Sequence, residues 1–187
     1  MKLSFSELIR EARQGSAAAQ KCLFDQLAGP MRVLCARYVR NPEVAEEIML
    51  DGFYKFFKGL QVLEYEGDAA FYGWLKKIMI NECLGYLRRK KAWVMVSETE
   101  AERVVWREDA LDRLSAREIF ELIVRLPEGY RAVFNLYSIE GWDHREISLQ
   151  LGISEGTSRS QLSKARALLQ KMLLQNGTNY VKRKKEG

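Results

Sequence analysis

Residues 143–172 read DHREISLQLGISEGTSRSQLSKARALLQKM and carry two helix-start signals separated by a glycine. Asp143, followed three residues later by Glu146, forms a capping box, which is typical of a helix N-terminus. Gly152 suits the left-handed position that ends such a helix, and Ser154 then caps a second, longer helix. A short helix, a turn containing glycine and a longer helix together predict a helix-turn-helix.

The second helix of this motif is the part that enters the major groove of duplex DNA. We expect its early exposed residues to reach base edges and phosphates, because arginine binds guanine O6 and N7 together and hydroxyl groups bind either kind of site. These candidate DNA-binding residues are Thr157, Arg159, Ser160, Ser163 and Lys164. An ordinary helical hairpin with a solvated polar face is the alternative. The turn residues and the basic outer face both favour DNA binding.

Helical patterns also fill the rest of the chain. Ser4 with Glu7 and Ser115 with Glu118 form two further capping boxes, and Asn41 precedes a proline at a first helical position. No segment alternates between apolar and polar residues for long enough to predict a strand. We therefore predict an all-α protein, and we expect its three prolines to lie at helix ends.

Charge divides the chain into two basic parts and an acidic bridge. The 187 residues include 30 Lys and Arg against 25 Asp and Glu, a net charge of +5. Residues 1–95 hold 15 basic and 11 acidic groups, residues 96–115 hold 3 and 6, and residues 116–187 hold 12 and 8. This distribution predicts two small helical domains, 1–95 and 116–187, joined by a flexible linker at 96–115. A solvated helix is the alternative for the bridge.

Composition argues against several classes of protein. The three cysteines (Cys22, Cys35 and Cys83) are widely spaced and only one histidine accompanies them, so we expect buried free thiols rather than a zinc site or disulfides. No apolar run approaches the roughly 20 residues of a membrane span, and no signal peptide is evident, which predicts a cytoplasmic protein without membrane insertion. His144 is expected at the surface or beside a phosphate. The chain offers little machinery for catalysis, so we expect no enzyme, no metal and no cofactor.

The helix predicted at about 69–91 has a polar face opposite its apolar stripe. Residues on this face recur at steps of four, four and three: Lys77, Asn81, Gly85 and Arg88. A basic run at 88–91 ends the helix, and a loop just before it carries Tyr65. An aromatic beside basic groups suits unstacked single-stranded bases. The alternative, equally supported by the residues alone, is that Tyr65 belongs to the core and the basic run is a solvated helix end.

The order and spacing of these motifs resemble bacterial sigma factors, specifically the compact two-domain extracytoplasmic-function (ECF) class, from about residue 5 to residue 174. In the N-terminal part, VAEEIMLDGF at 44–53 is similar to the family helix that grips core RNA polymerase, and FYGWLKKIMIN at 71–81 is similar to its promoter-melting helix. The C-terminal segments that are close to the family signature are Leu126-Pro127, YRAVF at 130–134, GISEGT at 152–157 and Ala165-Arg166.

The resemblance implies a non-catalytic subunit that binds core RNA polymerase and recognises two promoter elements, named −10 and −35. The duplex −35 element is implied for the candidate residues of the helix-turn-helix. The single-stranded −10 element is implied for Tyr65, Lys77, Asn81, Arg88 and Arg89, with a flipped base captured near Tyr65. Contact with the polymerase clamp is implied for Leu50, Asp51 and Phe53. Helices at about 115–126 and 128–140 are implied to dock on the polymerase flap, and an anti-sigma factor is implied as a further partner.

Two departures from the family pattern affect these expectations. Ser158 stands where many relatives have an apolar residue, and Leu50 with Asp51-Gly52 differs from a commoner Gln-Glu pair. The main alternative function is a helix-turn-helix transcription regulator that acts without polymerase, and such a regulator needs neither the acidic clamp helix nor the Tyr65 loop. A protein that only titrates a partner is a third possibility, against which the intact Asn81 and Arg159 argue.

Overall fold

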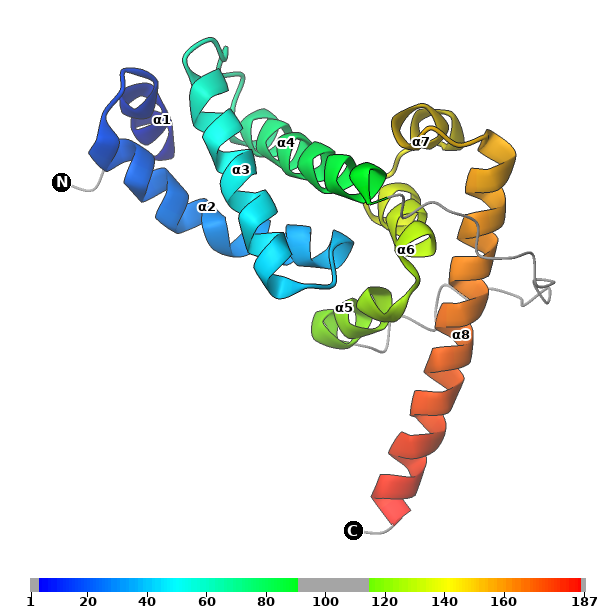
Figure 1. The fold of residues 1–187 in the computed structure, drawn as a ribbon. Coiled ribbons are helices and arrows are strands. Elements are labelled where there is room, and N and C mark those ends of the chain that lie inside the picture. The colour runs from blue at the N-terminus through cyan, green and yellow to red at the C-terminus, as the bar shows by residue number, and fades with distance from the viewer. Residues whose placement is uncertain (1–3, 91–114, 186–187) are drawn as a thin grey trace. The chain divides into compact units, whose positions relative to one another are not determined.

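The computed structural model describes residues 4–90 and 115–185, with side chains as far as residue 175 (Figure 1). Every regular element in these residues is a helix, which confirms the predicted all-α class. The chain divides into two compact units, Met1–Arg89 and Lys90–Gly187. The predicted linker at 96–115 lies outside the described residues except for Ser115, which caps a helix. None of the helices described here is long and apolar enough to span a membrane.

Four helices form the described part of the first unit, and two of them begin at the caps that the sequence predicts. They are α1 (Phe5–Arg13), α2 (Ala17–Tyr38), α3 (Pro42–Leu60) and α4 (Asp68–Arg89). The capping box of Ser4 and Glu7 is present at α1. Asn41 Oδ1 accepts hydrogen bonds from the N–H groups of Glu43 and Val44 at 2.9 and 3.1 Å, which satisfies two of the four unpaired donors at the start of α3.

Pro30 corrects the expectation that the prolines lie at helix ends, because it lies inside α2. A proline within a helix removes one backbone hydrogen bond and costs about 3 kcal/mol. Leu27 and Met31, on either side of it, are both buried in the unit's core. Tertiary packing of these two turns outweighs the local cost, since most helical stability in proteins comes from the buried face.

Aromatic rings fill the core where α2, α3 and α4 pack together. The ring centroid of Phe53 lies 4.8 Å from that of Phe24, and the ring of Phe56 lies 5.4 Å from Phe71 and 5.2 Å from Trp74. Such edge-on and tilted contacts add to the apolar area that these side chains bury. The core therefore fixes α3 and α4, the two helices that carry the predicted functional faces of this unit.

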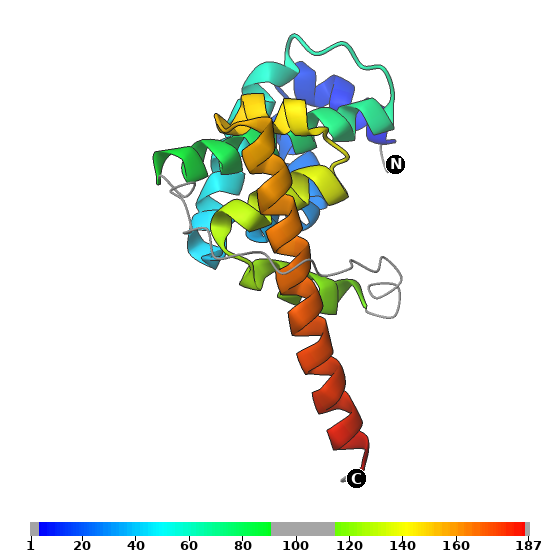
Figure 2. The same ribbon diagram turned by 90° about the vertical axis from the view of Figure 1, so that its right-hand side faces the viewer.

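The described part of the second unit contains five helical elements. They are α5 (Ala116–Arg125), α6 (Glu128–Phe134), η2 (Asn135–Ile139), α7 (His144–Leu151) and α8 (Glu155–Lys185). The capping boxes predicted at Ser115 and Asp143 are both present. The long helix α8 passes α7, α6 and α5 and extends beyond them (Figure 2). Its inner face buries Leu162, Ala165 and Leu169.

The helix predicted at about 128–140 is α-helical only as far as Phe134 and continues as the π-helical segment η2. Arg131, just before that change, is buried with 1% of its surface exposed. Its Nη1 donates to the carbonyl oxygens of Val124 and Leu126 at 2.9 and 3.1 Å. Arg131 thus satisfies carbonyl groups at the end of α5, where no helical partner is available.

Candidate nucleic-acid and polymerase-binding surfaces

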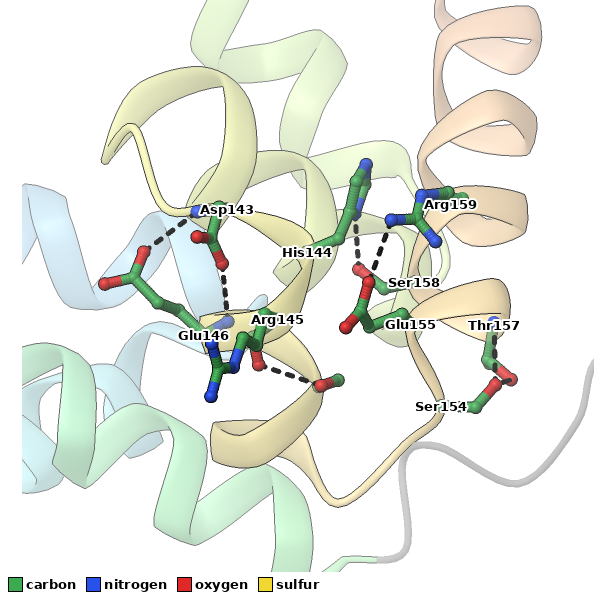
Figure 3. A network of polar contacts seen from close by, with 10 residues as sticks. Asp143, His144, Arg145, Glu146, Ser154, Glu155, Thr157, Ser158 and Arg159 are labelled. Carbon is green, nitrogen blue, oxygen red and sulfur yellow. Dashed lines mark hydrogen bonds and ion pairs between the residues drawn. The ribbon is translucent and has the colours of Figure 1, made fainter.

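The helix-turn-helix occupies α7 and α8, and hydrogen bonds at its turn fix where each helix starts (Figure 3). Asp143 Oδ1 accepts from the N–H of Glu146 at 2.7 Å, and the Glu146 carboxylate accepts in return from the N–H of Asp143 at 2.9 Å. Gly152 follows α7 with a φ of +68°, which glycine adopts without a Cβ penalty. Ser154 Oγ then accepts from the N–H of Thr157 at 3.0 Å.

The outer face of α8 begins directly after this turn. Of the five predicted DNA-binding residues, Lys164 is half-buried and the others are exposed: Thr157, Arg159, Ser160 and Ser163. Arg159 Nη2 lies 2.8 Å from Glu155 Oε2, one turn earlier on the same helix. An exposed pair of this kind stabilises the fold only slightly. Its main effect is to hold the guanidinium over the first turn of α8, where a recognition helix contacts bases.

Ser158 lies among these exposed residues but is fully buried. Its Oγ lies 2.9 Å from Nδ1 of His144, so a hydrogen bond joins the two helices of the motif (Figure 3). The His144 ring stacks on Tyr137 of η2, with centroids 4.6 Å apart and an interplanar angle of 21°. The guanidinium of Arg166 lies 5.7 Å from the centre of the same tyrosine ring. Side chains from η2, α7 and α8 therefore meet at this point.

This contact was not predicted from the sequence. His144 was expected at the surface or beside a phosphate, and it is instead half-buried. Ser158 was recognised only as a departure from an apolar position. The available signal was a serine at an inward-facing position of a helix, since a buried hydroxyl group needs a partner. Burial lowers the pKa of His144, and the positive charge of Arg159 lowers it further.

The polar face predicted on the first unit lies along α4. Lys77, Arg88 and Arg89 are exposed, and Asn81 is half-buried on the same helix. A Cβ added at Gly85 would lie 3.7 Å from Arg89 Nη1, which is an ordinary contact. Packing among the described residues therefore does not require a glycine at position 85. The face combines an amide with three cations, which can contact bases and phosphates respectively.

The loop before α4 holds Tyr65 in a half-buried position. Its hydroxyl group donates to Asp68 Oδ1, and this hydrogen bond to the carboxylate raises the pKa of the tyrosine. The ring meets Phe71 edge-on, with centroids 6.3 Å apart. Tyr65 is thus anchored at its polar tip and packed along one edge. The residue contacts Phe71 of the core and yet keeps exposed surface, and the binding of a base by Tyr65 stays a prediction.

The outer face of α3 carries Leu50 and Asp51, and both are exposed. Phe53 corrects the prediction for this face, since only 2% of its surface is exposed and its ring packs inside the aromatic core. We therefore exclude Phe53 from any partner-binding surface. Tyr54, which the sequence analysis did not select, is 69% exposed one helical turn after Leu50. Its signal was the spacing of four residues, which places it on the same face.

Two segments of the chain match models of protein families. Together they contain the outer face of α3, the polar face of α4 and the helix-turn-helix. Residues 23–92 match "Sigma-70 region 2" and residues 110–169 match "Sigma-70, region 4". The chain belongs to the sigma-70 family. Region 2 of this sigma-70 protein thus includes the faces of α3 and α4, and region 4 includes the helix-turn-helix.

Curated relatives place this sigma-70 protein in the ECF class. It is 29% identical over 178 residues to the ECF RNA polymerase sigma factor SigM of Mycobacterium tuberculosis, across 94% of this chain and 89% of SigM. It is 25% identical over 180 residues to the RNA polymerase sigma-H factor of Pseudomonas aeruginosa, across 89% of this chain and 92% of that factor. These relatives are sigma factors, a class of transcription initiation factors.

Solved structures of sigma factors are also similar to this sigma-70 protein. One is the sigma factor RpoE in complex with the anti-sigma factor NepR from Bartonella quintana, with 19% identity and a TM-score of 0.48. The match covers 83% of this chain and 96% of that one.

Within the described residues, no group of three or more His, Cys, Asp or Glu side chains is placed to hold a metal ion.

Proposed function

We propose that this protein is an alternative ECF sigma factor, which binds core RNA polymerase and directs it to a specific set of promoters. The observation that carries the proposal is that regions 2 and 4 occur in one chain, in order, each with an exposed polar face on a defined helix. The protein acts without catalytic chemistry of its own and works in the cytoplasm. Polymerase supplies the catalysis, and this chain supplies the choice of promoter.

The −35 element is recognised by α8 in the major groove. Arg159 has the geometry for a guanine contact, because its guanidinium is already held over the first turn of the helix by Glu155. Ser160, Ser163 and Thr157 contact phosphates or bases from the same exposed face. Lys164 adds a cation further along the helix.

The −10 element is bound in single-stranded form along α4. Asn81 reads a base edge through its amide, while Lys77, Arg88 and Arg89 contact the backbone phosphates. Tyr65 stands in the loop that begins this helix, and we assign it to the flipped base. Its ring is held by Asp68 and Phe71, so binding a base costs little further ordering of this side chain.

Core polymerase binds the outer face of α3 at Leu50 and Asp51, with Tyr54 extending that face. Leu50 and Tyr54 expose apolar surface one helical turn apart, which a partner could cover, and Asp51 beside them offers a charge for specificity. The same surface is a target for an anti-sigma factor, which would then block polymerase directly. The helices α5 and α6 dock on the polymerase flap.

A pull-down of core RNA polymerase by the purified chain tests the proposal. Asp51→Arg should abolish binding by reversing the charge at the centre of the α3 face. Asp25→Arg is the matched control, since it makes the same charge change on α2 and disturbs only an exposed ion pair with Lys21. Binding of duplex DNA without any binding of polymerase would contradict the proposal and favour a helix-turn-helix regulator that acts alone.

A further inference from the structure

A hydrogen bond between the side chains of His144 and Ser158 joins α7 to α8, and the −35 proposal does not use it. Ser158 has no exposed surface, and its hydroxyl group would lose a partner if the imidazole were removed. A buried hydroxyl group without a partner destabilises the folded state, because its lost bond to water is not replaced. The neighbouring residue in the chain is Arg159, which points outward on the DNA-binding face.

We propose that His144 and Ser158 are positioning residues for −35 recognition, because their hydrogen bond sets the rotation of the first turn of α8 relative to α7. This inference rests on the proposed function. In a helix-turn-helix, the first helix crosses the DNA backbone while the second enters the groove. A change in the angle between the helices would therefore move Arg159 away from its base while the phosphate contacts remain.

The ring of Tyr137, which stacks on His144, strengthens this assignment. Tyr137 holds one face of the imidazole at a centroid distance of 4.6 Å, and Arg166 covers the same tyrosine from α8. The imidazole is thus confined in its plane, and its Nδ1 is aimed at Ser158. A ring that is stacked on one face and hydrogen-bonded at one edge presents a fixed orientation to its partner, as positioning residues must do for a precise site.

The charges around His144 connect the same contact to Arg159. Glu155, Arg159 and Arg166 lie near the imidazole from α8, Asp143 lies near it at the start of α7, and Tyr137 covers it from η2. A proton on the imidazole would repel Arg159 and attract Glu155. These are the two partners of the ion pair that holds the guanidinium in place. Neutral His144 therefore favours the ordered Arg159, and protonated His144 weakens its tether.

Two single variants and their combination separate positioning from bulk stability. His144→Phe keeps a ring on Tyr137 but leaves the Ser158 hydroxyl group unpaired, and Ser158→Ala removes that hydroxyl group. The double variant has no unpaired polar group at this contact, and replacing both partners by apolar groups is often nearly neutral. We expect His144→Phe to be the more destabilising single change and the double variant to recover stability, whereas all three variants lack the bond and should lose the orientation of Arg159.

The assay uses the full chain and a duplex that the wild-type protein selects from a random DNA pool, together with a scrambled duplex of the same base composition. The measured quantity is the ratio of the two affinities, which does not depend on the fraction of protein folded. His144→Phe should lower this ratio about tenfold, because a bidentate contact from Arg159 to guanine contributes discrimination of that order and the misplaced guanidinium would lose it. The double variant should keep a ratio within about threefold of that of His144→Phe, because it also lacks the hydrogen bond and the two changes remove the same interaction.

A pH series gives the second measurement. The wild-type ratio should fall between pH 8 and pH 5 as His144 gains a proton, and the double variant should show no such fall. A wild-type ratio in the double variant, or the same pH profile in wild type and in His144→Phe, would overturn the inference while leaving −35 recognition intact. Failure of the wild-type protein to select any duplex would instead contradict the proposed function.

Discussion

Replacing Gly52 by alanine should disturb the contact between the helix proposed to bind polymerase and the helix proposed to bind the −10 element. Gly52 lies on the buried face of α3, where a Cβ would overlap Sδ of Met79 on α4 and lie 3.0 Å from its Cε. Met79 is itself fully buried, so its side chain has little room to move. The new methyl group must therefore push α3 and α4 apart or force Met79 into a poorer rotamer.

The net effect follows from two opposed contributions. Alanine is favoured over glycine within a helix by about 1 kcal/mol. Overpacking of a core costs about 1–3 kcal/mol, so Gly52→Ala should destabilise the first unit by about 1 kcal/mol. Gly73 on α4 is the matched control, because it is exposed and a Cβ there would meet nothing within 4 Å. Gly73→Ala should stabilise the same unit by about 1 kcal/mol through helix propensity alone.

Hydrogen exchange of peptides from α3 and α4, measured by mass spectrometry in the full chain, gives the opening free energy of this unit. The two variants should differ by about 2 kcal/mol. In a Met79→Ala background the obstacle is gone, so Gly52→Ala should become stabilising. If Gly52→Ala were as stable as Gly73→Ala in the otherwise unchanged chain, the claim that α3 and α4 approach too closely for a methyl group would be refuted.

Two further predictions concern the second unit. Arg131→Leu should lower its stability by about 3 kcal/mol in urea unfolding, because it leaves the carbonyl groups of Val124 and Leu126 without their charged donor; Arg125→Leu, an exposed arginine of α5, should change it by less than about 0.5 kcal/mol. The stability of this unit should also fall as the pH drops below about 6.5, since the unfolded chain protonates His144 near that pH while the folded chain resists the proton. His144→Phe should remove this part of the pH dependence in the same unfolding assay, and an unchanged pH slope would contradict it.

Local signals in the sequence were sufficient for the helices and for the turn of the helix-turn-helix. Ser4, Asn41, Ser115 and Asp143 mark helix starts because their side chains bond N–H groups only a few residues away. Gly152 marks a helix end because its backbone conformation excludes most other residues. Such interactions are complete within a short window and need no knowledge of the rest of the fold.

Interactions between distant residues were not predictable in the same way. Phe53 belongs to the apolar stripe of α3 and also to the segment that resembles a polymerase-binding helix, and burial decided between them. The hydrogen bond between His144 and Ser158 joins two helices, so the local sequence around either residue does not predict it. Pro30 lies within α2 because core packing outweighs a local rule. These outcomes depend on tertiary contacts, which helical periodicity alone does not specify.

The π-helical segment η2 makes side-chain directions sensitive to the insertion or deletion of a single residue. A π-helical turn holds one residue more than an α-helical turn, and one residue corresponds to about 100° of rotation around a helix axis. Removing Asn135 or Leu136 would therefore rotate Tyr137 by about 100° relative to α6 and away from His144. Aligning this protein with a relative that lacks the extra residue would pair side chains that face different directions. In this segment a single insertion or deletion is a change of geometry, and sequence identity does not measure it.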